Sequence, residues 1–126
     1  MSFMERKESV VASKAYSFAL KIVKLYKHLS SEKKEFVLSK QILRSGTAIG
    51  ANTNEAISAQ SKRDFVYKLG IAAKEARETL YWLRLLKDSD YISEDYFEKL
   101  ATDCNEIIKI LNSIILTTKA KYFLTQ

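Results

Sequence analysis

Apolar residues recur along the chain at steps of three and four, the spacing that places side chains on one face of an α-helix. The pattern is most regular near the C-terminus, where the steps alternate like those of the inner seam of a helical bundle. The apolar positions of the four stretches are Val11, Phe18, Ile22, Leu25 and Leu29; Leu38, Ile42, Ile49 and Ala56; Phe65, Leu69, Ala72, Ala76, Leu80 and Leu83; and Leu100, Cys104, Ile107, Leu111, Ile114 and Thr118. The pattern therefore predicts four amphipathic helices.

Capping signals and short polar runs divide the chain between these helices. Ser2 and Glu5 have the spacing of a capping box, although Ser9 is a second candidate start. Ser61 and Ser93 are suited to N-cap positions, and acidic residues follow each of them in the first helical turn. The first expected helix begins near residue 2 or residue 9 and ends near residue 29. The other three cover residues 33–59, 61–88 and 93 onward. Four long helices with short connections predict an all-α, up-down-up-down four-helix bundle, one domain over residues 1–126.

The composition agrees with a folded helical chain. The 126 residues include no proline and three glycines, while 47% are hydrophobic and 29% are charged. A disordered chain would have fewer apolar residues, and a loop-rich β fold would need more turn residues. Charges within residues 1–11 leave no signal-peptide core, and no apolar run approaches the roughly 20 residues of a membrane span. We therefore expect a cytoplasmic protein without a membrane partner.

The sequence offers little from which an active site could be built. The single cysteine and the single histidine exclude a disulfide framework and thiolate-rich zinc sites. His28 has Leu25 three residues before it, where carboxylate-bridged metal bundles require glutamate. Cys104 lies on the predicted inner seam, which favours an inert thiol. Glu75 and Glu78 are a conceivable acid/base pair, but carboxylates on consecutive turns are more typical of a solvated or ion-paired helix face. We expect no enzyme activity, no metal and no cofactor.

Two of the predicted helices carry more apolar surface than one bundle can bury. The first helix spreads apolar residues over a wide arc that includes Tyr16, Leu20 and Val23. The third helix has a second strip opposite its inner seam. The members of this strip are Tyr67, Ile71, Trp82 and Leu85. Exposed apolar strips usually mark interfaces, so self-association is the simplest interpretation. The alternative is that packing at the bundle ends covers these side chains.

Small residues interrupt the second predicted helix. Gly46 and Gly50 each cost about 1 kcal/mol relative to alanine inside a helix, which indicates close approach by another segment. With Ala51, they are predicted oligomer contacts. The polar residues of the same stretch are Arg44, Asn52 and Glu55. We favour a structural interpretation, in which Arg44 and Glu55 clamp a tight helix contact, over a polar recognition site, because buried polar groups often fix register.

Positive charge is concentrated in the first half of the chain. Residues 1–60 hold ten basic and five acidic side chains, and the whole chain has a net charge of +6. Four basic residues recur every seven positions on the first helix, and a fifth lies beside them: Lys7, Lys14, Lys21 and His28, and Lys24. This lysine line predicts binding to nucleic-acid phosphates, although it is also typical of a solvated helix face. No aromatic residue is interleaved with it, so we expect backbone binding without base stacking.

A motif over the second and third predicted helices carries a family resemblance. It consists of Gln41, Arg44-Ser45, Ala48-Ile49-Gly50-Ala51-Asn52 and Glu55-Ala56, and it continues through residues 61–65 and 71–83. The motif resembles that of the bacterial four-helix bundle proteins encoded within 23S rRNA intervening sequences, which are often labelled ribosomal proteins. Position 48 is alanine, where the family often has serine, so a hydroxyl role at that position is lost.

The resemblance implies a homopentamer of bundles. It also implies kinship with the accessory proteins of diversity-generating retroelements, which resemble basic pentameric barrels that bind nucleic acid and a reverse transcriptase. Together with the lysine line, it leads us to expect a non-enzymatic, oligomeric RNA- or DNA-binding accessory protein that contacts phosphates through a basic helix face. The alternative is a protein-interaction scaffold whose charge serves solubility alone.

Overall fold

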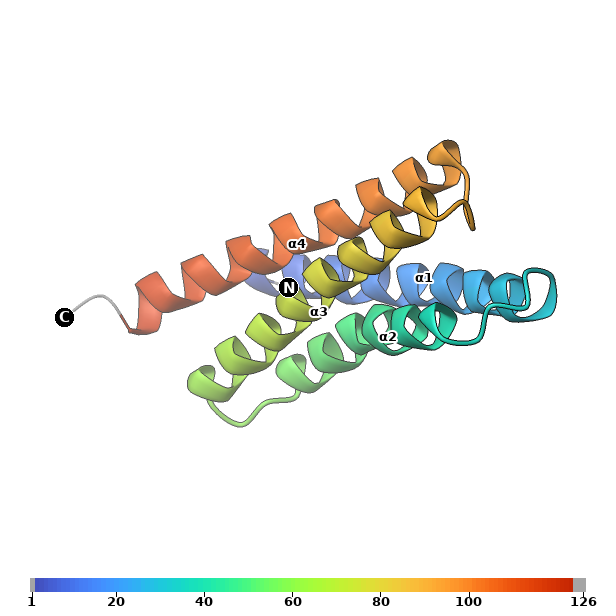
Figure 1. Cartoon of the computed structure of the whole chain (residues 1–126). Coiled ribbons are helices and arrows are strands. Elements are labelled where there is room, and N and C mark those ends of the chain that lie inside the picture. Colours follow the sequence, from blue (N-terminus) through green and yellow to red (C-terminus); the bar gives the residue numbers. More distant parts are fainter. Residues whose placement is uncertain (1, 124–126) are drawn as a thin grey trace.

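The computed structural model describes residues 2–123, which form four α-helices (Figure 1). They are α1 (Phe3–Ser31), α2 (Leu38–Ile57), α3 (Lys62–Asp88) and α4 (Glu94–Tyr122). Both α1 and α3 pack on α2 and on α4. The hairpins α1–α2 and α3–α4 diverge toward the end that carries the connections 32–37 and 89–93 (Figure 1). Over the described residues the predicted all-α, four-helix architecture is confirmed.

Three of the helices begin where the capping signals predict. The Ser2 hydroxyl accepts a hydrogen bond from the Glu5 N–H at 3.1 Å, and the Glu5 carboxylate accepts one from the Ser2 N–H at 3.2 Å. This capping box resolves the start of α1 in favour of Ser2 over Ser9. Ser61 caps α3 by accepting from the Asp64 N–H at 3.0 Å, and Ser93 caps α4 by accepting from the Tyr96 N–H at 3.1 Å.

The start of α2 differs from the prediction, because residues 33–37 form a connection and not a first helical turn. The Glu35 carboxylate accepts hydrogen bonds from the N–H groups of Val37, Leu38 and Ser39 at 3.2, 3.0 and 2.7 Å. Partial burial works to raise the pKa of Glu35, but these three hydrogen bonds outweigh it and hold the pKa below its usual value. A carboxylate ahead of the helix therefore replaces the missing N-cap side chain at Val37.

The core contains the predicted inner seams. Their members are buried, apart from Leu38 and Leu80, which are half-buried. Cys104 is fully buried, and its thiol donates a hydrogen bond to the Ala76 carbonyl oxygen at 3.3 Å. Burial, with a smaller contribution from the charge of Asp103, raises the pKa of the Cys104 thiol to about 12. The prediction that this thiol is buried is confirmed.

The two glycines of α2 face α1 of the same chain, so the close approach that they indicate occurs inside the bundle, and their predicted role as oligomer contacts stays a prediction. A Cβ built on Gly46 would lie 2.8 Å from two side-chain carbons of Ile22. A Cβ on Gly50 would lie 3.6 Å from Ala15. Their small size is used for close packing of α2 on α1 inside the bundle. Ala51 is exposed, and its predicted role as an oligomer contact stays a prediction.

Within residues 2–123, none of the four helices combines the length and the apolar content that crossing a membrane requires.

Candidate nucleic-acid interface

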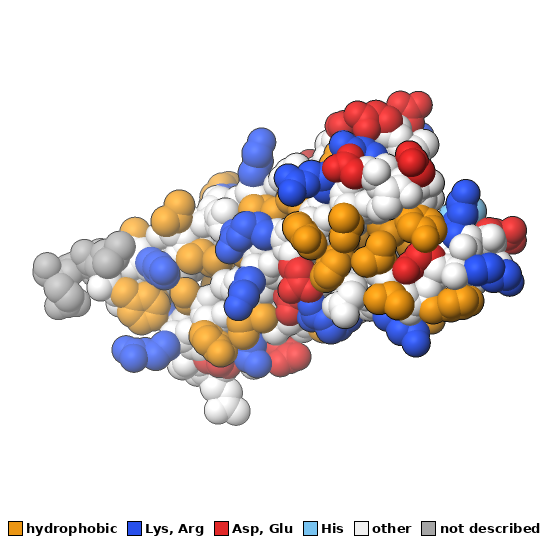
Figure 2. Space-filling view, viewed as in Figure 1, with side chains coloured by type: hydrophobic (Ala, Val, Ile, Leu, Met, Phe, Trp, Pro, Cys, Tyr) orange, Lys and Arg blue, Asp and Glu red, His pale blue; other side chains and the backbone are white. Residues whose placement is uncertain are grey.

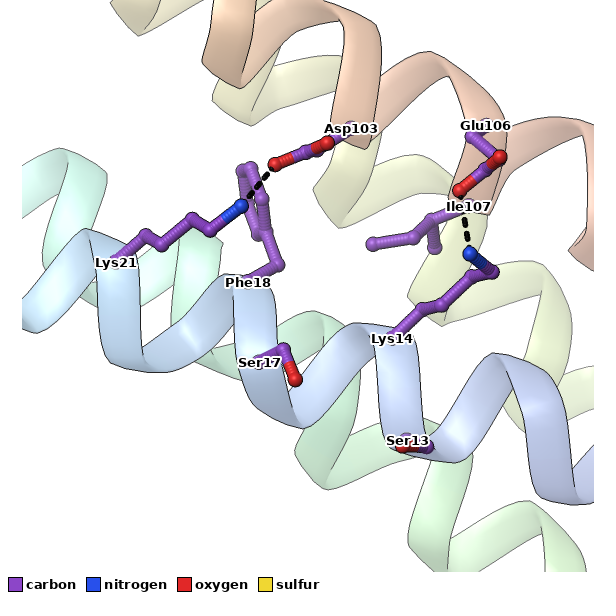
Figure 3. Close-up of a pocket in the computed structure, with 8 residues that line it drawn as sticks. All are labelled: Ser13, Lys14, Ser17, Phe18, Lys21, Asp103, Glu106 and Ile107. Carbon is purple, nitrogen blue, oxygen red and sulfur yellow. Dashed lines mark hydrogen bonds and ion pairs between the residues drawn. The ribbon is translucent and has the colours of Figure 1, made fainter.

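The lysine line of α1 lies against α4. The Lys14 ammonium is 2.8 Å from a carboxylate oxygen of Glu106, and the Lys21 ammonium is 2.6 Å from one of Asp103. Figure 3 shows both side chains reaching across from α1, with Phe18 and Ile107 between the two pairs. The Lys7 ammonium donates a hydrogen bond to the Ser113 hydroxyl at 2.5 Å. The first three members of the line thus each have a partner on α4, and their predicted binding to phosphates stays a prediction.

The two remaining members of the line have no such partner. Lys24 and His28 are exposed near the C-terminal end of α1, and neither forms an ion pair within residues 2–123. The difference arises because the carboxylates of α4 that face α1 are Asp103 and Glu106, which lie opposite the middle of the line. The members of the line whose side chains have no ion-pair or hydrogen-bond partner in the described residues thus lie at one end of the helix.

A second basic face, on α3, was missed by the sequence analysis. Its members recur at steps of four and three from Arg63 to Arg84: Arg63, Tyr67, Gly70, Lys74, Arg77, Tyr81 and Arg84. We call this set the α3 outer face. Its charged and aromatic side chains are exposed, and Tyr67 and Tyr81 keep 64% and 52% of their surface. In the part of the chain that the structure describes, none of its four cations forms an ion pair.

Simple charge counting hides the α3 outer face. Residues 61–126 contain eleven basic and ten acidic side chains, which suggested that this half carries almost no net charge. The structure separates the two signs in space. Most of the acidic side chains lie on α4 or at the α3–α4 turn, seen in red at the upper right of Figure 2, and Glu75 and Glu78 of α3 turn toward Arg44 of α2. The repeating step of four and three from Arg63 is the signal that could have found the face.

The two carboxylates in the middle of α3 turn away from its outer face, toward α2. Arg44 forms an ion pair with Glu75 at 3.2 Å and a shorter one with Glu78. The Trp82 indole N–H also donates to the Glu78 carboxylate at 3.1 Å. The pKa of Glu78 is lowered chiefly by the hydrogen bond from Trp82 and also by the Arg44 guanidinium. Partial desolvation acts in the opposite direction and offsets some of this effect. The predicted ion-paired face at Glu75 and Glu78 is confirmed.

The clamp predicted for the α2 motif is present, and it joins α2 to α3. Besides Arg44, Glu55 contributes by pairing with Lys68 of α3 at 3.0 Å. Asn52 is half-buried and donates from its amide nitrogen to the Ala48 carbonyl oxygen of its own helix at 2.9 Å. Both charged residues thus pair with α3, as the structural interpretation predicts. α2 uses its glycines against α1 and its charges against α3.

The apolar strip of α1 remains largely uncovered, and that of α3 remains uncovered in part. Tyr16 and Leu20 on α1 are 65% and 56% exposed, and Tyr67 on α3 is 64% exposed. Packing at the bundle ends does not cover these three side chains. The other three members of the α3 strip, Ile71, Trp82 and Leu85, are half-buried. A single copy of the chain thus exposes large apolar side chains on two helices.

The same fold and sequence pattern occur in known proteins. A family model described as 23S rRNA-intervening sequence protein matches residues 7–113. The chain is also similar to a crystal structure of a protein with unknown function from the S23 ribosomal protein family of Bacteroides thetaiotaomicron VPI-5482, with 57% sequence identity and a TM-score of 0.86. That similarity covers 86% of this chain and 97% of the other. No curated protein matches the chain. Because the family model spans most of the sequence and includes the motif of α2, the chain belongs to the 23S rRNA-intervening sequence protein family.

Proposed function

We propose that this protein is a non-enzymatic accessory protein that binds RNA or DNA through phosphate contacts and works as a homo-oligomer. The observation that supports binding most directly is the α3 outer face, with four exposed cations that have no carboxylate partner in the described residues. Cations of this kind can exchange their counterions for phosphates, which gives affinity without sequence preference.

The length of the α3 outer face sets the expected size of the bound strand. Arg63 and Arg84 are separated by 21 positions, or about 31 Å at the rise of an α-helix. A stacked strand has one phosphate per roughly 3.4 Å, so about nine nucleotides would follow the face. Tyr67 and Tyr81 offer exposed rings between the cations, so base stacking accompanies the phosphate contacts. This proposal replaces the expectation of binding to the backbone alone.

Assembly follows from the uncovered apolar strips. Tyr16 and Leu20 of one copy would pack on the flank of α3 of the next, which holds Ile71, Trp82 and Leu85. Because these are two different surfaces, the contact is head-to-tail and can close into a ring. The family resemblance implies five copies. A ring would repeat the α3 outer face around its circumference and so raise the local positive potential.

The family resemblance also supplies a reverse transcriptase as the expected protein partner. The cytoplasm remains the expected location, on the evidence of the sequence composition. The rival function is a protein-interaction scaffold without affinity for nucleic acid, which the exposed Tyr16 and Leu20 would serve equally well. The two functions differ in what they predict for a simple binding measurement.

The test is a salt titration of binding to a 12-nucleotide single-stranded RNA labelled with fluorescein at its 3′ end, followed by anisotropy. The proposal predicts affinity that falls linearly with salt on logarithmic axes. Arg77→Glu with Arg84→Glu should lower the slope by about 1.4, because two phosphate contacts are lost. Absence of binding at 50 mM salt would favour the scaffold.

Assembly is measured separately, by light scattering at several protein concentrations. The wild-type chain should have the mass of an oligomer, and Tyr16→Ser with Leu20→Ser should shift it toward the mass of one chain. A single-chain mass for the wild type at high concentration would remove the oligomer from the proposal and leave the binding face untouched.

A further inference from the structure

A hollow lies at the end of the bundle where the two helical hairpins diverge. It has a volume of about 430 Å³ and is lined by residues from three separate segments. Lys24 and His28 come from α1, Lys33 from the α1–α2 connection, and Tyr91 and Tyr96 from the α3–α4 turn and the first turn of α4. Its volume is within the usual range of small-molecule sites, about 300–1,000 Å³.

The basic side of this hollow is not neutralised by its surroundings. Further along α1, Lys14 and Lys21 meet the carboxylates of Glu106 and Asp103. At the hollow, the lining residue from α4 itself is Tyr96, which is not a carboxylate. Lys24, His28 and Lys33 form no ion pair within residues 2–123. Along this face of α1, the basic side chains are therefore ion-paired at Lys21 and without an ion pair at Lys24 and His28, within about two helical turns.

The opposite side of the hollow is aromatic. Tyr91 and Tyr96 are half-buried, because one side of each ring packs on the core. Burial raises the pKa of Tyr96, and the nearby charge of Lys21 lowers it less, so its hydroxyl is neutral near pH 7. A half-buried ring is a fixed platform that loses little side-chain entropy when a planar group stacks on it.

Both connections that border the hollow contain a residue in the left-handed backbone region. Lys34 has φ of 55° and Asp90 has φ of 67°, and over the described residues they are the two non-glycine residues with positive φ. Lys34 directly follows Lys33, and Asp90 directly precedes Tyr91. This conformation costs roughly 1–2 kcal/mol for an ordinary residue, so the surrounding fold holds both connections in place.

We infer that the hollow binds a nucleotide that bears a terminal phosphate, with the phosphate at Lys24 and Lys33 and the base against Tyr91 and Tyr96. A terminal phosphate carries about −1.5 to −2 charges near pH 7, which matches two lysines better than the single charge of a phosphodiester. Aromatic rings beside cations are suited to a base joined to phosphate. The ligand is either a free nucleotide or the 5′ end of a strand, and only the second source rests on the proposed function.

The acidic α3–α4 turn limits how a longer ligand could lie. Asp90, Glu94 and Asp95 are exposed there, and only Glu94 has a cation nearby, Lys87 at 3.6 Å. These carboxylates would repel a row of phosphates that continued over the turn. The hollow is therefore suited to one nucleotide at the end of a strand and not to the middle of a strand.

The first experiment uses adenosine monophosphate and, as a control ligand, inorganic phosphate. Nuclear magnetic resonance of the aromatic side chains should show the ring signals of Tyr91 and Tyr96 shifting with adenosine monophosphate and staying in place with phosphate. Lys24→Gln with Lys33→Gln should weaken binding about tenfold or more, since hydrogen bonds to charged groups are lost. The control double variant is Lys27→Gln with Lys40→Gln, two exposed lysines that do not line the hollow. Unshifted tyrosine signals, or equal effects of the two double variants, would overturn the inference.

A second experiment separates the two sources of the nucleotide. Two RNAs of the same sequence, one with a 5′ phosphate and one with a 5′ hydroxyl, are titrated against the wild-type chain. A strand end is the ligand if the phosphorylated RNA binds at least about tenfold more tightly and Lys24→Gln with Lys33→Gln removes that difference. A free nucleotide is the ligand if adenosine monophosphate binds and the two RNAs do not differ. If both RNAs bind equally and adenosine monophosphate does not bind, the hollow does not bind a nucleotide, and the proposed function stands. If neither RNA binds, the proposed function fails, whatever the result for adenosine monophosphate.

Discussion

The lysine line of α1 and the α3 outer face have similar charges in sequence and different surroundings in the fold. Lys14 and Lys21 of the line meet Glu106 and Asp103, because α4 packs along that side of α1. The cations of the α3 outer face, such as Lys74 and Arg77, are exposed and form no ion pair within residues 2–123. The periodicity of a basic helix face shows that its charges lie together. It does not show whether a carboxylate on another helix already occupies them.

The comparison also separates stability from binding. The ion pairs of Lys14 and Lys21 are at the surface, with Lys14 and Glu106 side chains 42% and 54% exposed, so each contributes only about 0–1 kcal/mol to folding. Their larger effect is to remove two positive charges from the potential that a phosphate would meet. Replacing either partner should therefore change binding more than the free energy of unfolding.

The largest effect is expected from releasing the lysine line. Asp103→Asn with Glu106→Gln removes both carboxylates and frees Lys14 and Lys21 for phosphates. Affinity for the 12-nucleotide RNA should rise by about tenfold or more at 0.1 M salt, and the logarithmic salt slope should steepen by about 1.5. The measurement is the same anisotropy titration used for the wild-type chain.

A control for this gain is Glu32→Gln with Glu98→Gln, which removes the same amount of negative charge from two exposed carboxylates that form no ion pair within residues 2–123. It changes the net charge equally but leaves Lys14 and Lys21 paired. If both double variants bind RNA equally well, net charge and not the release of the lysine line explains the gain.

Two glycines provide the same contrast between a covered and an uncovered helix face. Gly46→Ala places a Cβ 2.8 Å from Ile22, so overpacking should lower the free energy of unfolding by about 1–2 kcal/mol after the helix-propensity gain is subtracted. A Cβ on Gly70 would meet no atom within 4 Å, and Gly70→Ala should raise the free energy of unfolding by about 0.5–1 kcal/mol. Urea denaturation of both variants measures the difference, and a stabilised Gly46→Ala variant would show that α2 does not approach α1 this closely.

The smallest effect concerns the side of α3 whose carboxylates, Glu75 and Glu78, pair with Arg44 of α2. The pKa of Glu78 is lower in the folded chain than its ordinary value of 4.5, chiefly because Trp82 donates a hydrogen bond to it. Its stabilisation is therefore complete above the unfolded pKa and is lost as the pH falls through the lower folded pKa. Stability measured from pH 5 to pH 3 should fall less steeply in Glu78→Gln than in the wild type. Glu98→Gln, an exposed position on α4, serves as the control.

Much of the fold could be predicted because it depends on local signals. The inner seams follow from helical spacing, and Ser2, Ser61 and Ser93 begin their helices through hydrogen bonds to residues three positions later. The start of α2 could not be predicted in this way. Its first N–H groups are capped by the long side chain of Glu35, which precedes the helix, and Lys34 adopts a backbone conformation that lysine rarely takes.

The candidate interface was harder to predict because it depends on which helices lie side by side. Lys21 and Asp103 are far apart in the sequence, and nothing local to either one indicates their ion pair. Gly46 correctly signalled a close approach, but its partner was Ile22 of the same chain and not a second copy. The hollow at the end of the bundle joins Lys33 to Tyr91 across two connections, which no spacing rule relates.

The central claim is that nucleic acid binds to the α3 outer face and not to the middle of the lysine line. The most direct test compares the salt dependence of RNA binding by two matched double variants, Lys74→Gln with Arg77→Gln and Lys14→Gln with Lys21→Gln. Each removes two positive charges, so any difference between them depends on position. The account predicts that the α3 variant loses about 1.5 from the logarithmic slope while the α1 variant keeps the wild-type slope. The reverse order, with the loss in the α1 variant, would contradict it.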